Sequence, residues 1–284
     1  MPELPEVEVL RLGLSPFVVG KTIVDIQTPH PRTTRDIGSV EDFHNKILGA
    51  RIESSSRIGK YMILWLCGQN HKISALIIHL GMSGRLYKSL EEPDQLIPTK
   101  HLNFIVKFSD NSKLIFFDPR TFGKVFLDTS GRRPIPSYLE KLGPDALNSL
   151  DPMLKIVTYA KNSSRAIKHL MLDQNLLAGV GNIYGDEILN RCGIAPNRPA
   201  NLVSENELEM ISDVMPKLLR RAVMLRGSSL VDQGYRDIEG NLGEFQKFHR
   251  VYGRGGKPCL SCGEEILRVS IASRSSFYCP DCQV

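Results

Sequence analysis

The segment CLSCGEEILRVSIASRSSFYCPDC, residues 259–282, decides how the end of this chain folds. Two Cys-x-x-Cys pairs, Cys259 with Cys262 and Cys279 with Cys282, are separated by sixteen residues. Four thiolates at this spacing can close a tetrahedral zinc site in which two turns face each other across the ion. An iron–sulfur cluster and a chance arrangement are the alternatives. A site with four cysteine ligands has no open position, so we expect one structural Zn²⁺ without a catalytic role.

The residues between the two cysteine pairs are long enough for a β-hairpin with Arg274 near its tip. Residues 245–284 carry a net charge of +3, which is most of the formal charge of +5 of the whole chain. A guanidinium on such a hairpin could bind a phosphate. On this module alone, an ordinary solvated arginine is an equally good interpretation.

The whole chain has 284 residues, of which 42% are hydrophobic, so it can form two domains, or one domain with appendages. No apolar run approaches 18 residues, and the acidic N-terminus does not resemble a secretory signal. We therefore expect no membrane partner, and a location that is cytoplasmic and nucleoid-associated in a bacterium or nuclear in a eukaryote. In a reducing compartment clustered cysteines favour a metal over disulfides, and the isolated Cys67 and Cys192 are expected to be buried thiols or residues without a role.

Residues 151–244, on the N-terminal side of the zinc module, have the pattern of a helical domain. Apolar residues recur every three or four positions, and Ser204 with Glu207 matches a capping box at the start of a long predicted helix. Residues 227–243 lack periodicity and are predicted to be a loop. The Pro- and Gly-rich residues 131–150 are predicted to be the linker to the preceding domain.

Residues 1–130 are predicted to form a β-sandwich with an N-terminal helix packed against it. Apolar residues fall at helical spacing over residues 5–18, and strand-length apolar or alternating runs follow, separated by turn signals. The predicted strands are residues 22–26, 61–67, 73–80, 101–108, 114–117 and 124–127. With the helical domain and the zinc module of residues 245–284, the chain is predicted to be an α+β multidomain protein.

The first residues, MPELPEVE, offer an unusual nucleophile. If Met1 is removed, the chain begins with the secondary amine of Pro2, beside the carboxylate of Glu3. An α-amino group titrates at about pH 8, so part of it is unprotonated near neutral pH and can form a Schiff base with a carbonyl carbon. The alternative is that the prolines and acids only begin a helix, with Glu6 complementing its dipole. With Met1 attached, the Pro2 nitrogen is a tertiary amide and unreactive.

Four turns carry groups suited to contact nucleic acid, each with a plainer alternative. Residues 179–182, which read GVGN, precede a helix whose N-terminal N–H groups could bind phosphate, or they only join two helices. Lys60 follows a glycine before a strand and could bind phosphate or lie in solvent. Met82, Arg120 and Phe122 lie in glycine-containing turns, where they could enter a base stack or anchor the turns. Enzymes that act on a base in duplex DNA must flip the nucleotide out and fill the gap, and these groups together fit that task.

Seven motifs along the chain resemble those of the formamidopyrimidine-DNA glycosylases. They run in the family's order over essentially all 284 residues, and the joint pattern is highly specific. The motifs are PELPEVE (2–8), GKY (59–61), HLGMSG (79–84), DPRxFG (118–123), GVGNIYGDE (179–187), VYGR (251–254) and the cysteine pairs that end in CPDCQ (279–283). The resemblance implies a helix-two-turn-helix domain at residues 151–244. It also implies a monomeric DNA glycosylase and AP lyase that removes oxidised purines, such as 8-oxoguanine and formamidopyrimidines, from damaged double-stranded DNA.

The resemblance further implies a role for each matching residue. Pro2 attacks C1′ of the flipped nucleotide, Glu3 acts on the sugar ring and in proton transfer, and Glu6 supports the site. The resulting Schiff base allows β- and then δ-elimination of the flanking phosphates, with Lys60 and Arg274 in the catalytic set. The implied DNA-binding residues are Lys60, Met82, His101, Arg120, Phe122, Lys168, Asn182 and Arg274, of which Met82, Arg120 and Phe122 fill the gap left by the flipped base.

The chain departs from the usual family pattern at Val9, Thr121, Ser273 and residues 226–231, which leaves the preferred lesion and the opposite-base preference open. Two other functions also stay open. A catalytically silent DNA-damage binder would keep the wedge residues and the zinc hairpin without forming a covalent adduct. A glycosylase for oxidised pyrimidines would keep the chemistry and change the substrate, and excision rates on a panel of lesions would identify it.

Overall fold

The computed structural model describes residues 2–28, 30, 32–33, 39–68, 71–90, 99–230 and 234–284. Met1 and residues 231–233 of the predicted loop lie outside the described residues. The chain divides into two compact units, each built from segments that are far apart in sequence. Unit 1 comprises residues 1–2, 6–140 and 228–243, and unit 2 comprises residues 3–5, 141–227 and 244–284. Within the described part of the chain, none of the helices is long and apolar enough to cross a membrane.

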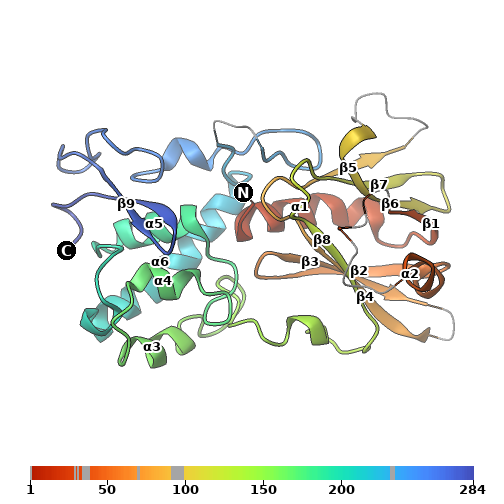
Figure 1. Ribbon diagram of the computed structural model, residues 1–284, viewed down its shortest axis with the longest axis horizontal. Helices are drawn as coiled ribbons and strands as arrows, with labels where there is room; N and C mark the ends of the chain where they lie inside the picture. The colour runs from red at the N-terminus through yellow and green to blue at the C-terminus, as the bar shows by residue number, and fades with distance from the viewer. Residues whose placement is uncertain are drawn as a thin grey trace. The chain divides into compact units, whose positions relative to one another are not determined.

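Unit 1 contains the predicted β-sandwich, formed by two four-stranded antiparallel sheets (Figure 1). One sheet has the strand order β1-β6-β7-β5, and the other has the order β2-β3-β4-β8. The strands are β1 (Ile23–Gln27), β2 (Arg51–Ile58), β3 (Tyr61–Cys67), β4 (Ile73–His79), β5 (Arg85–Ser89), β6 (Leu102–Phe108), β7 (Lys113–Phe117) and β8 (Lys124–Asp128). The helices are α1 (Leu4–Val18), most of which belongs to this unit, α2 (Val40–Ile47) and the 3₁₀ turns η3 (Thr99–His101) and η4 (Ser137–Leu139).

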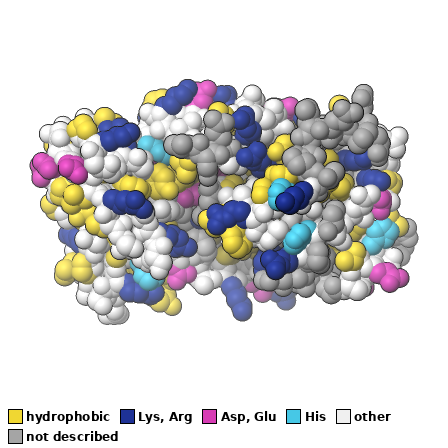
Figure 2. Space-filling view, turned by 45° about the horizontal axis from the view of Figure 1, so that its top comes forward, with side chains coloured by type: hydrophobic (Ala, Val, Ile, Leu, Met, Phe, Trp, Pro, Cys, Tyr) yellow, Lys and Arg dark blue, Asp and Glu magenta, His cyan; other side chains and the backbone are white. Residues whose placement is uncertain are grey.

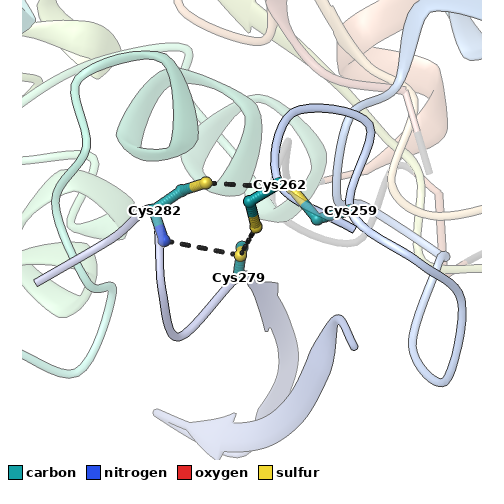
Figure 3. Close-up of side chains that lie close together, drawn as sticks. All are labelled: Cys259, Cys262, Cys279 and Cys282. Carbon is teal, nitrogen blue, oxygen red and sulfur yellow. Dashed lines mark hydrogen bonds between the residues drawn. The ribbon is translucent and has the colours of Figure 1, made fainter. Parts of the chain in front are cut away.

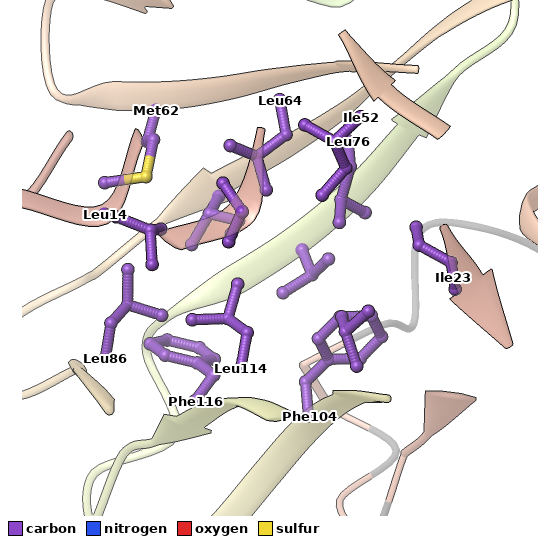
Figure 4. Packing of buried hydrophobic residues seen from close by; sticks show 14 of the residues in the cluster. Leu14, Ile23, Ile52, Met62, Leu64, Leu76, Leu86, Phe104, Leu114 and Phe116 are labelled. Atoms are coloured by element: carbon purple, nitrogen blue, oxygen red, sulfur yellow. The ribbon is translucent and has the colours of Figure 1, made fainter. Parts of the chain in front are cut away.

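The core of unit 1 joins both sheets to α1. The helix buries a stripe with 3- and 4-residue spacing, which consists of Val7, Leu10, Leu14 and Val18. Figure 4 shows Leu14 between Met62 of one sheet and Leu86 of the other. Full burial of each such side chain contributes roughly 1.5–3 kcal/mol. The helix that begins at the PELPEVE motif is therefore fixed by the sandwich core.

Unit 2 combines the helical segment with the zinc module. Its helices are α3 (Leu154–Ala160), α4 (Ile167–Leu172), α5 (Asn182–Arg191), α6 (Glu205–Met224) and the 3₁₀ turns η5 (Ala200–Leu202) and η6 (Phe245–Phe248). The predicted hairpin is present as β9 (Leu267–Ile271) and β10 (Arg274–Tyr278), which pair in antiparallel register. The capping box of Ser204 and Glu207 is confirmed at the start of α6, with both reciprocal hydrogen bonds formed.

The two compact units divide the chain differently from the predicted domains at two places. Residues 131–150 are not one linker, because residues 131–140 belong to unit 1 and the remainder to unit 2. The buried carboxylate of Asp128 accepts hydrogen bonds from Ser137 and Tyr138, which holds the first part against β8. The loop of residues 228–243 belongs to unit 1 and not to the helical domain, since Tyr235 and Ile238 are part of the sandwich core.

Candidate active site and nucleic-acid interface

The carboxylate of Glu3 lies at the N-terminus of α5. Its side chain is almost completely buried and accepts the backbone N–H groups of Ile183 at 2.9 Å and Tyr184 at 3.4 Å. Gly181 makes room for it, because a Cβ at this position would lie 2.3 Å from the Glu3 carboxyl carbon. The unpaired N–H groups and dipole of a helix N-terminus stabilise a carboxylate there. The fold therefore holds Glu3 in one position.

This arrangement corrects the interpretation of the GVGN motif as a phosphate loop. Gly179, which has a positive φ of +111°, packs against the side chain of Leu4, and its carbonyl accepts the Leu4 N–H at 3.3 Å. The two glycines thus accommodate residues 3 and 4 of the same chain. The helix N–H groups predicted to bind a phosphate instead bind Glu3.

Pro2 and Glu6 flank this point in sequence, and both are buried. The Oε1 atom of Glu6 accepts the backbone N–H of Ser228 at 2.7 Å, which connects α1 to the loop segment that begins at Ser228. This loop is one of the places where the chain departs from the family pattern. Through this contact Glu6 connects Ser228 to the opening motif.

Lys60 lies half-buried in the tight turn between β2 and β3. The neighbouring His79 stacks on Tyr61 with ring centroids 4.6 Å apart, and its Nδ1 accepts the Gly81 N–H at 3.2 Å. Burial, together with the positive charges of Lys60 and Lys124, lowers the pKa of His79 to about 4. His79 is therefore neutral at physiological pH, and its ring nitrogen can hold the turn that contains Met82.

The three predicted gap-filling residues are exposed and lie on two turns that contact each other. Met82 and Phe122 are 41% and 53% exposed, and the guanidinium of Arg120 lies 5.1 Å from the centroid of the Phe122 ring. The turns approach closely because residue 81 is a glycine. A Cβ at Gly81 would lie 2.6 Å from the backbone of Phe122 and of Gly123. The structure thus brings a thioether, a guanidinium and an aromatic ring to one exposed place.

Asp118 organises this pair of turns and was not identified from the sequence. Its fully buried carboxylate accepts the Ser83 hydroxyl at 2.5 Å and the N–H groups of Arg120 at 3.2 Å and Gly123 at 2.7 Å. The predicted DNA-binding residue His101 lies next to it, half-buried, and its carbonyl accepts the Asp118 N–H at 3.0 Å. The available signal in the sequence was an aspartate that directly follows the apolar, strand-length run of residues 114–117.

Lys168 does not fit the predicted DNA contact. Its side chain has no exposed surface, and Nζ lies 2.7 Å from each of three oxygens, on Asn182, Ser276 and Asp186. Nζ donates hydrogen bonds to Asn182 and Ser276, and the carboxylate of Asp186 balances its charge as an ion-pair partner. Burial lowers the pKa of Lys168 and raises the pKa of Asp186 to about 7. We correct the prediction accordingly: Lys168 supports Asn182 and strand β10 from inside unit 2.

The predicted phosphate-binding residues Asn182 and Arg274 are both connected to the zinc hairpin. The Asn182 amide donates to the Ser275 carbonyl at 2.8 Å, and the second N–H of an amide NH₂ group can serve a ligand. Arg274 is exposed and is the first residue of β10, directly after the two-residue turn. The expected position of this arginine near the hairpin tip is confirmed.

Glu187, in the same motif as Asn182, is a second acidic residue that the sequence interpretation missed. Its buried carboxylate accepts the backbone N–H groups of Arg250, Val251 and Tyr252 at distances of 2.9–3.0 Å. Burial raises its pKa, but the charges of His249 and Arg191 and these N–H groups lower the pKa overall. Glu187 thereby fixes the VYGR segment that leads into the zinc module.

The four predicted cysteine ligands converge, as Figure 3 shows. Their sulfur atoms all lie within 4.8 Å of one another, with 3.9 Å between Cys259 and Cys282 and 3.4 Å between Cys262 and Cys279. A tetrahedral zinc site with Zn–S bonds of about 2.3 Å has sulfur–sulfur edges of roughly 3.8 Å. Backbone N–H groups point at two of the sulfurs, at 3.4 Å in each case. The donor set and its spacing therefore fit a closed Zn²⁺ site.

The surface charge is consistent with a polyanionic ligand. On the face drawn in Figure 2, Lys and Arg side chains are spread among hydrophobic ones and are more frequent than Asp and Glu. The formal net charge of the chain is +5. A positive surface raises the local concentration of nucleic acid and speeds association at low salt.

Sequence models of three protein domains match the chain in order. Residues 1–125 match the formamidopyrimidine-DNA glycosylase N-terminal domain, and residues 142–233 match the helix-two-turn-helix domain of the same enzymes. Residues 256–284 match a zinc finger that is found in these enzymes and in isoleucyl-tRNA synthetase. The resemblance seen in the motifs and the expected order of domains are confirmed.

Whole-chain relatives give the same assignment. The chain is 36% identical over 289 residues to a formamidopyrimidine-DNA glycosylase of Desulfitobacterium hafniense and 39% identical over 284 residues to one of Thermus thermophilus. In both cases 100% of this chain is covered, with 100% and 98% of the relative. A crystal structure of a Lactococcus lactis FPG variant in complex with Fapy-dG-containing DNA superposes with a TM-score of 0.85 at 32% identity, covering 99% of each chain.

Proposed function

We propose that this chain, which belongs to the formamidopyrimidine-DNA glycosylase family and is a DNA glycosylase, removes oxidised purines from duplex DNA and then cleaves the strand. The observation that carries the proposal is the position of Glu3. A buried carboxylate, held by the N-terminus of α5 and by the space at Gly181, directly follows the proline whose amine would be the nucleophile. A helix start would not require so specific a support for this side chain.

In the proposed reaction Pro2 is the first residue, so its nitrogen is a secondary amine. The amine attacks C1′ of the flipped nucleotide, the bond from C1′ to the base breaks, and the base leaves with a proton. The Glu3 carboxylate takes the N–H proton that the attacking amine loses and gives it to the sugar-ring oxygen as the ring opens, which leaves an iminium ion between Pro2 and C1′. Loss of a C2′ proton then expels the 3′ phosphate, and a second elimination expels the 5′ phosphate.

The other residues hold the DNA in this proposal. Lys60 and Arg274 bind the phosphates that leave and act in the eliminations, and Asn182 and His101 bind the backbone of the damaged strand. Met82, Arg120 and Phe122 fill the gap, with the Arg120 guanidinium available to the orphaned base. Glu6 supports the site through Ser228. Lys168 is no longer among the DNA contacts, because it is buried.

A single structural Zn²⁺ is part of the proposal. Cys259, Cys262, Cys279 and Cys282 would hold it, and the ion would supply no catalytic chemistry, because four thiolates leave no position for water or substrate. Its contribution is to keep β9 and β10 together and so to present Arg274. We further propose that the enzyme acts as a monomer on one damaged site.

Borohydride trapping tests this proposal. The chain that begins at Pro2, verified by intact mass, is incubated with duplex DNA that contains 8-oxoguanine and reduced with borohydride. We expect a covalent protein–DNA band, and we expect Glu3→Gln to bind the DNA but to excise no base. If the protein that begins at Pro2 binds damaged DNA without forming any adduct, the enzyme interpretation is wrong. If it excises oxidised pyrimidines faster than oxidised purines, the proposed substrate class is wrong.

A further inference from the structure

Arg57 is a buried cation that the proposed reaction does not use. Its side chain has no exposed surface, and its Nε donates to the Glu8 carboxylate at 3.1 Å. Its Nη1 donates to the backbone carbonyl of Gly59 at 2.9 Å. The guanidinium therefore connects a carboxylate on α1 to the turn between β2 and β3, and Lys60 is the next residue in that turn.

Glu8 is held as firmly as Arg57. The side chain of Arg11, one turn further along α1, reaches both oxygens of the Glu8 carboxylate, at 3.0 Å through Nε and at 2.6 Å through Nη2. Two guanidinium groups thus share one carboxylate, which is only 14% exposed. A buried guanidinium needs such a partner, because removing one member of a buried ion pair leaves an uncompensated charge.

Through its hydrogen bond to the Gly59 carbonyl, the ion pair can fix the orientation of Lys60. Gly59 has a positive φ of +56°, and a fork-shaped guanidinium that binds its carbonyl fixes the orientation of the peptide group that precedes Lys60. The residues on the two sides of the turn, Ile58 and Tyr61, are paired across β2 and β3. With the strands and the carbonyl fixed, the direction in which the lysine side chain leaves the turn is fixed as well.

We propose that Glu8 and Arg57 are a positioning pair for Lys60, which hold its ammonium group where the departing phosphate requires it. Neither residue touches DNA in this proposal. The inference rests on the proposed function of Lys60, and it extends the role of the PELPEVE motif. Pro2, Glu3 and Glu6 would serve the nucleophile, and Glu8 would serve a different catalytic group on the neighbouring strand turn.

A double-mutant cycle tests the pair in the full-length, zinc-loaded chain that begins at Pro2. Single-turnover rates of base excision and of strand cleavage at a preformed abasic site are measured for wild type, Glu8→Gln, Lys60→Met and the double variant. Glu53→Gln is the matched control, since Glu53 lies on the same strand β2 and pairs with Arg133 at an exposed position. We expect Glu8→Gln to slow strand cleavage about tenfold, as a small displacement of a catalytic group does, and Glu53→Gln to leave the rate unchanged.

The double variant separates a positioning role from a general loss of stability. If Glu8 acts through Lys60, the double variant cleaves at the rate of Lys60→Met alone. If the double variant instead showed the product of the two single rate losses, Glu8 would act independently of Lys60. That result, or a wild-type rate for Glu8→Gln, would overturn the positioning role and leave the proposed function intact. A wild-type rate for Lys60→Met would overturn the role of Lys60 and the positioning pair with it, whereas an inactive wild type would overturn the proposed function itself.

A second variant covers the case in which Glu8→Gln unfolds. Combining Glu8→Gln with Arg57→Met removes the fully buried cation together with the carboxylate, and such replacements are often tolerated. Arg11, the second partner of Glu8, keeps its charge, but its side chain is 19% exposed and so remains in contact with solvent. We expect this folded variant to show the same tenfold loss of strand cleavage with an unchanged apparent affinity for DNA. Wild-type cleavage in it would show that Lys60 needs no positioning pair.

Discussion

Glu3 can reach the N-terminus of α5 only because residue 181 has no Cβ. The backbone of Gly181, with φ −128° and ψ −160°, is extended and suits any residue, so the requirement is for space alone. We predict that Gly181→Ala displaces the carboxylate and lowers the excision rate about 100-fold, as misplaced catalytic groups do. Single-turnover excision on 8-oxoguanine DNA measures the effect.

Gly185→Ala, within the same helix α5, is the matched control for Gly181→Ala. A Cβ at Gly185 would have no neighbour closer than 3.6 Å, which is ordinary contact. This variant should keep its activity and gain roughly 0.5–1 kcal/mol of stability, because alanine favours a helix interior over glycine. Full activity in Gly181→Ala would show that the close contact with Glu3 is not needed for catalysis.

His79 makes the stability of unit 1 depend on pH. Burial and the charges of Lys60 and Lys124 lower the pKa of His79 from 6.5 to about 4. Between these values the unfolded chain binds more protons than the folded one, so stability falls as the pH falls. From pH 7.5 to pH 5 we predict that this residue costs about 2 kcal/mol of stability.

Urea unfolding of wild type and His79→Gln at both pH values measures the contribution of His79. The difference between the two proteins in their pH dependence isolates this group from the other titrating residues. Between pH 7.5 and pH 5, we expect the free energy of unfolding of His79→Gln to fall by about 2 kcal/mol less than that of the wild type. Protonation would also remove the bond from Gly81 to Nδ1, so acid should loosen the turn that contains Met82. An identical pH dependence in both proteins would rule out His79 as its source.

At the scale of elements, the turn between β9 and β10 carries local strain. It has two residues, Ala272 and Ser273, with positive φ of +50° and +59°, where glycine and asparagine are the favourable residues. Ser273 is also a position at which the chain departs from the family pattern. We predict that Ser273→Gly raises the free energy of unfolding of the zinc-loaded protein by about 1 kcal/mol. Thermal and urea unfolding measure it.

Ser270→Gly is the control for Ser273→Gly, since Ser270 is exposed in the regular part of strand β9. Glycine there should destabilise the hairpin by roughly 0.5–1 kcal/mol, because it has a larger conformational entropy in the unfolded chain. Opposite signs for the two variants would establish the strain in the turn. If both variants lost stability, the serine would be well accommodated at position 273.

The elements that the sequence predicts are those with regular patterns over many residues. The helix at residues 5–18 and the strands with apolar runs are present, whereas α2, β2 and β5 were not individually predicted. Strand β2 contains three consecutive serines, which hide the alternation of apolar residues. Helix α2 is short and has only two fully buried residues, Phe43 and Ile47. Their conformation depends on packing against partners that are distant in sequence.

In the candidate site, the sequence likewise did not predict the contacts of the buried charged residues. The motifs identify Glu3, Arg120 and Arg274 because these residue types suit the chemistry. They do not reveal that the Asp118 and Glu187 carboxylates bind backbone N–H groups, or that Lys168 is buried. A lysine in a motif has the same letter whether it faces solvent or a core. Only its three partners in unit 2 show which applies.

At the scale of the whole molecule, neither of the two compact units is contiguous in sequence. Residues 6–140 and 228–243 of unit 1 flank residues 141–227 of unit 2, and residues 244–284 of unit 2 follow residues 228–243 of unit 1. The loop of residues 228–243 joins unit 1 because Tyr235 and Ile238 fill its core, although helices of unit 2 precede it. The sequence of this aperiodic stretch indicates that Tyr235 and Ile238 are buried, but it does not indicate which of the two units they pack in. Domain boundaries were therefore less predictable than the domains themselves.

The separation into units allows the role of the metal to be tested in isolation. The only tryptophan, Trp65, lies in β3 of unit 1, is 5% exposed and donates to the Ser56 hydroxyl at 2.8 Å. The four cysteine ligands lie in unit 2. Trp65 fluorescence therefore reports on the sandwich, and DNA affinity reports on the hairpin.

We predict that removing zinc with a chelator, or Cys279→Ser, disorders the hairpin and weakens DNA binding at least tenfold, while Trp65 emission stays unchanged. The reason is that β9 and β10 are short, and the four thiolates that would hold the metal lie before β9 and after β10, where the ion would join the open ends of the two strands. Cys192→Ala, a buried cysteine outside the cluster, is the control and should retain both zinc and affinity. Unchanged affinity after metal loss, verified by elemental analysis, would mean that Arg274 is positioned without zinc. A shift in Trp65 emission would mean that the metal stabilises both units.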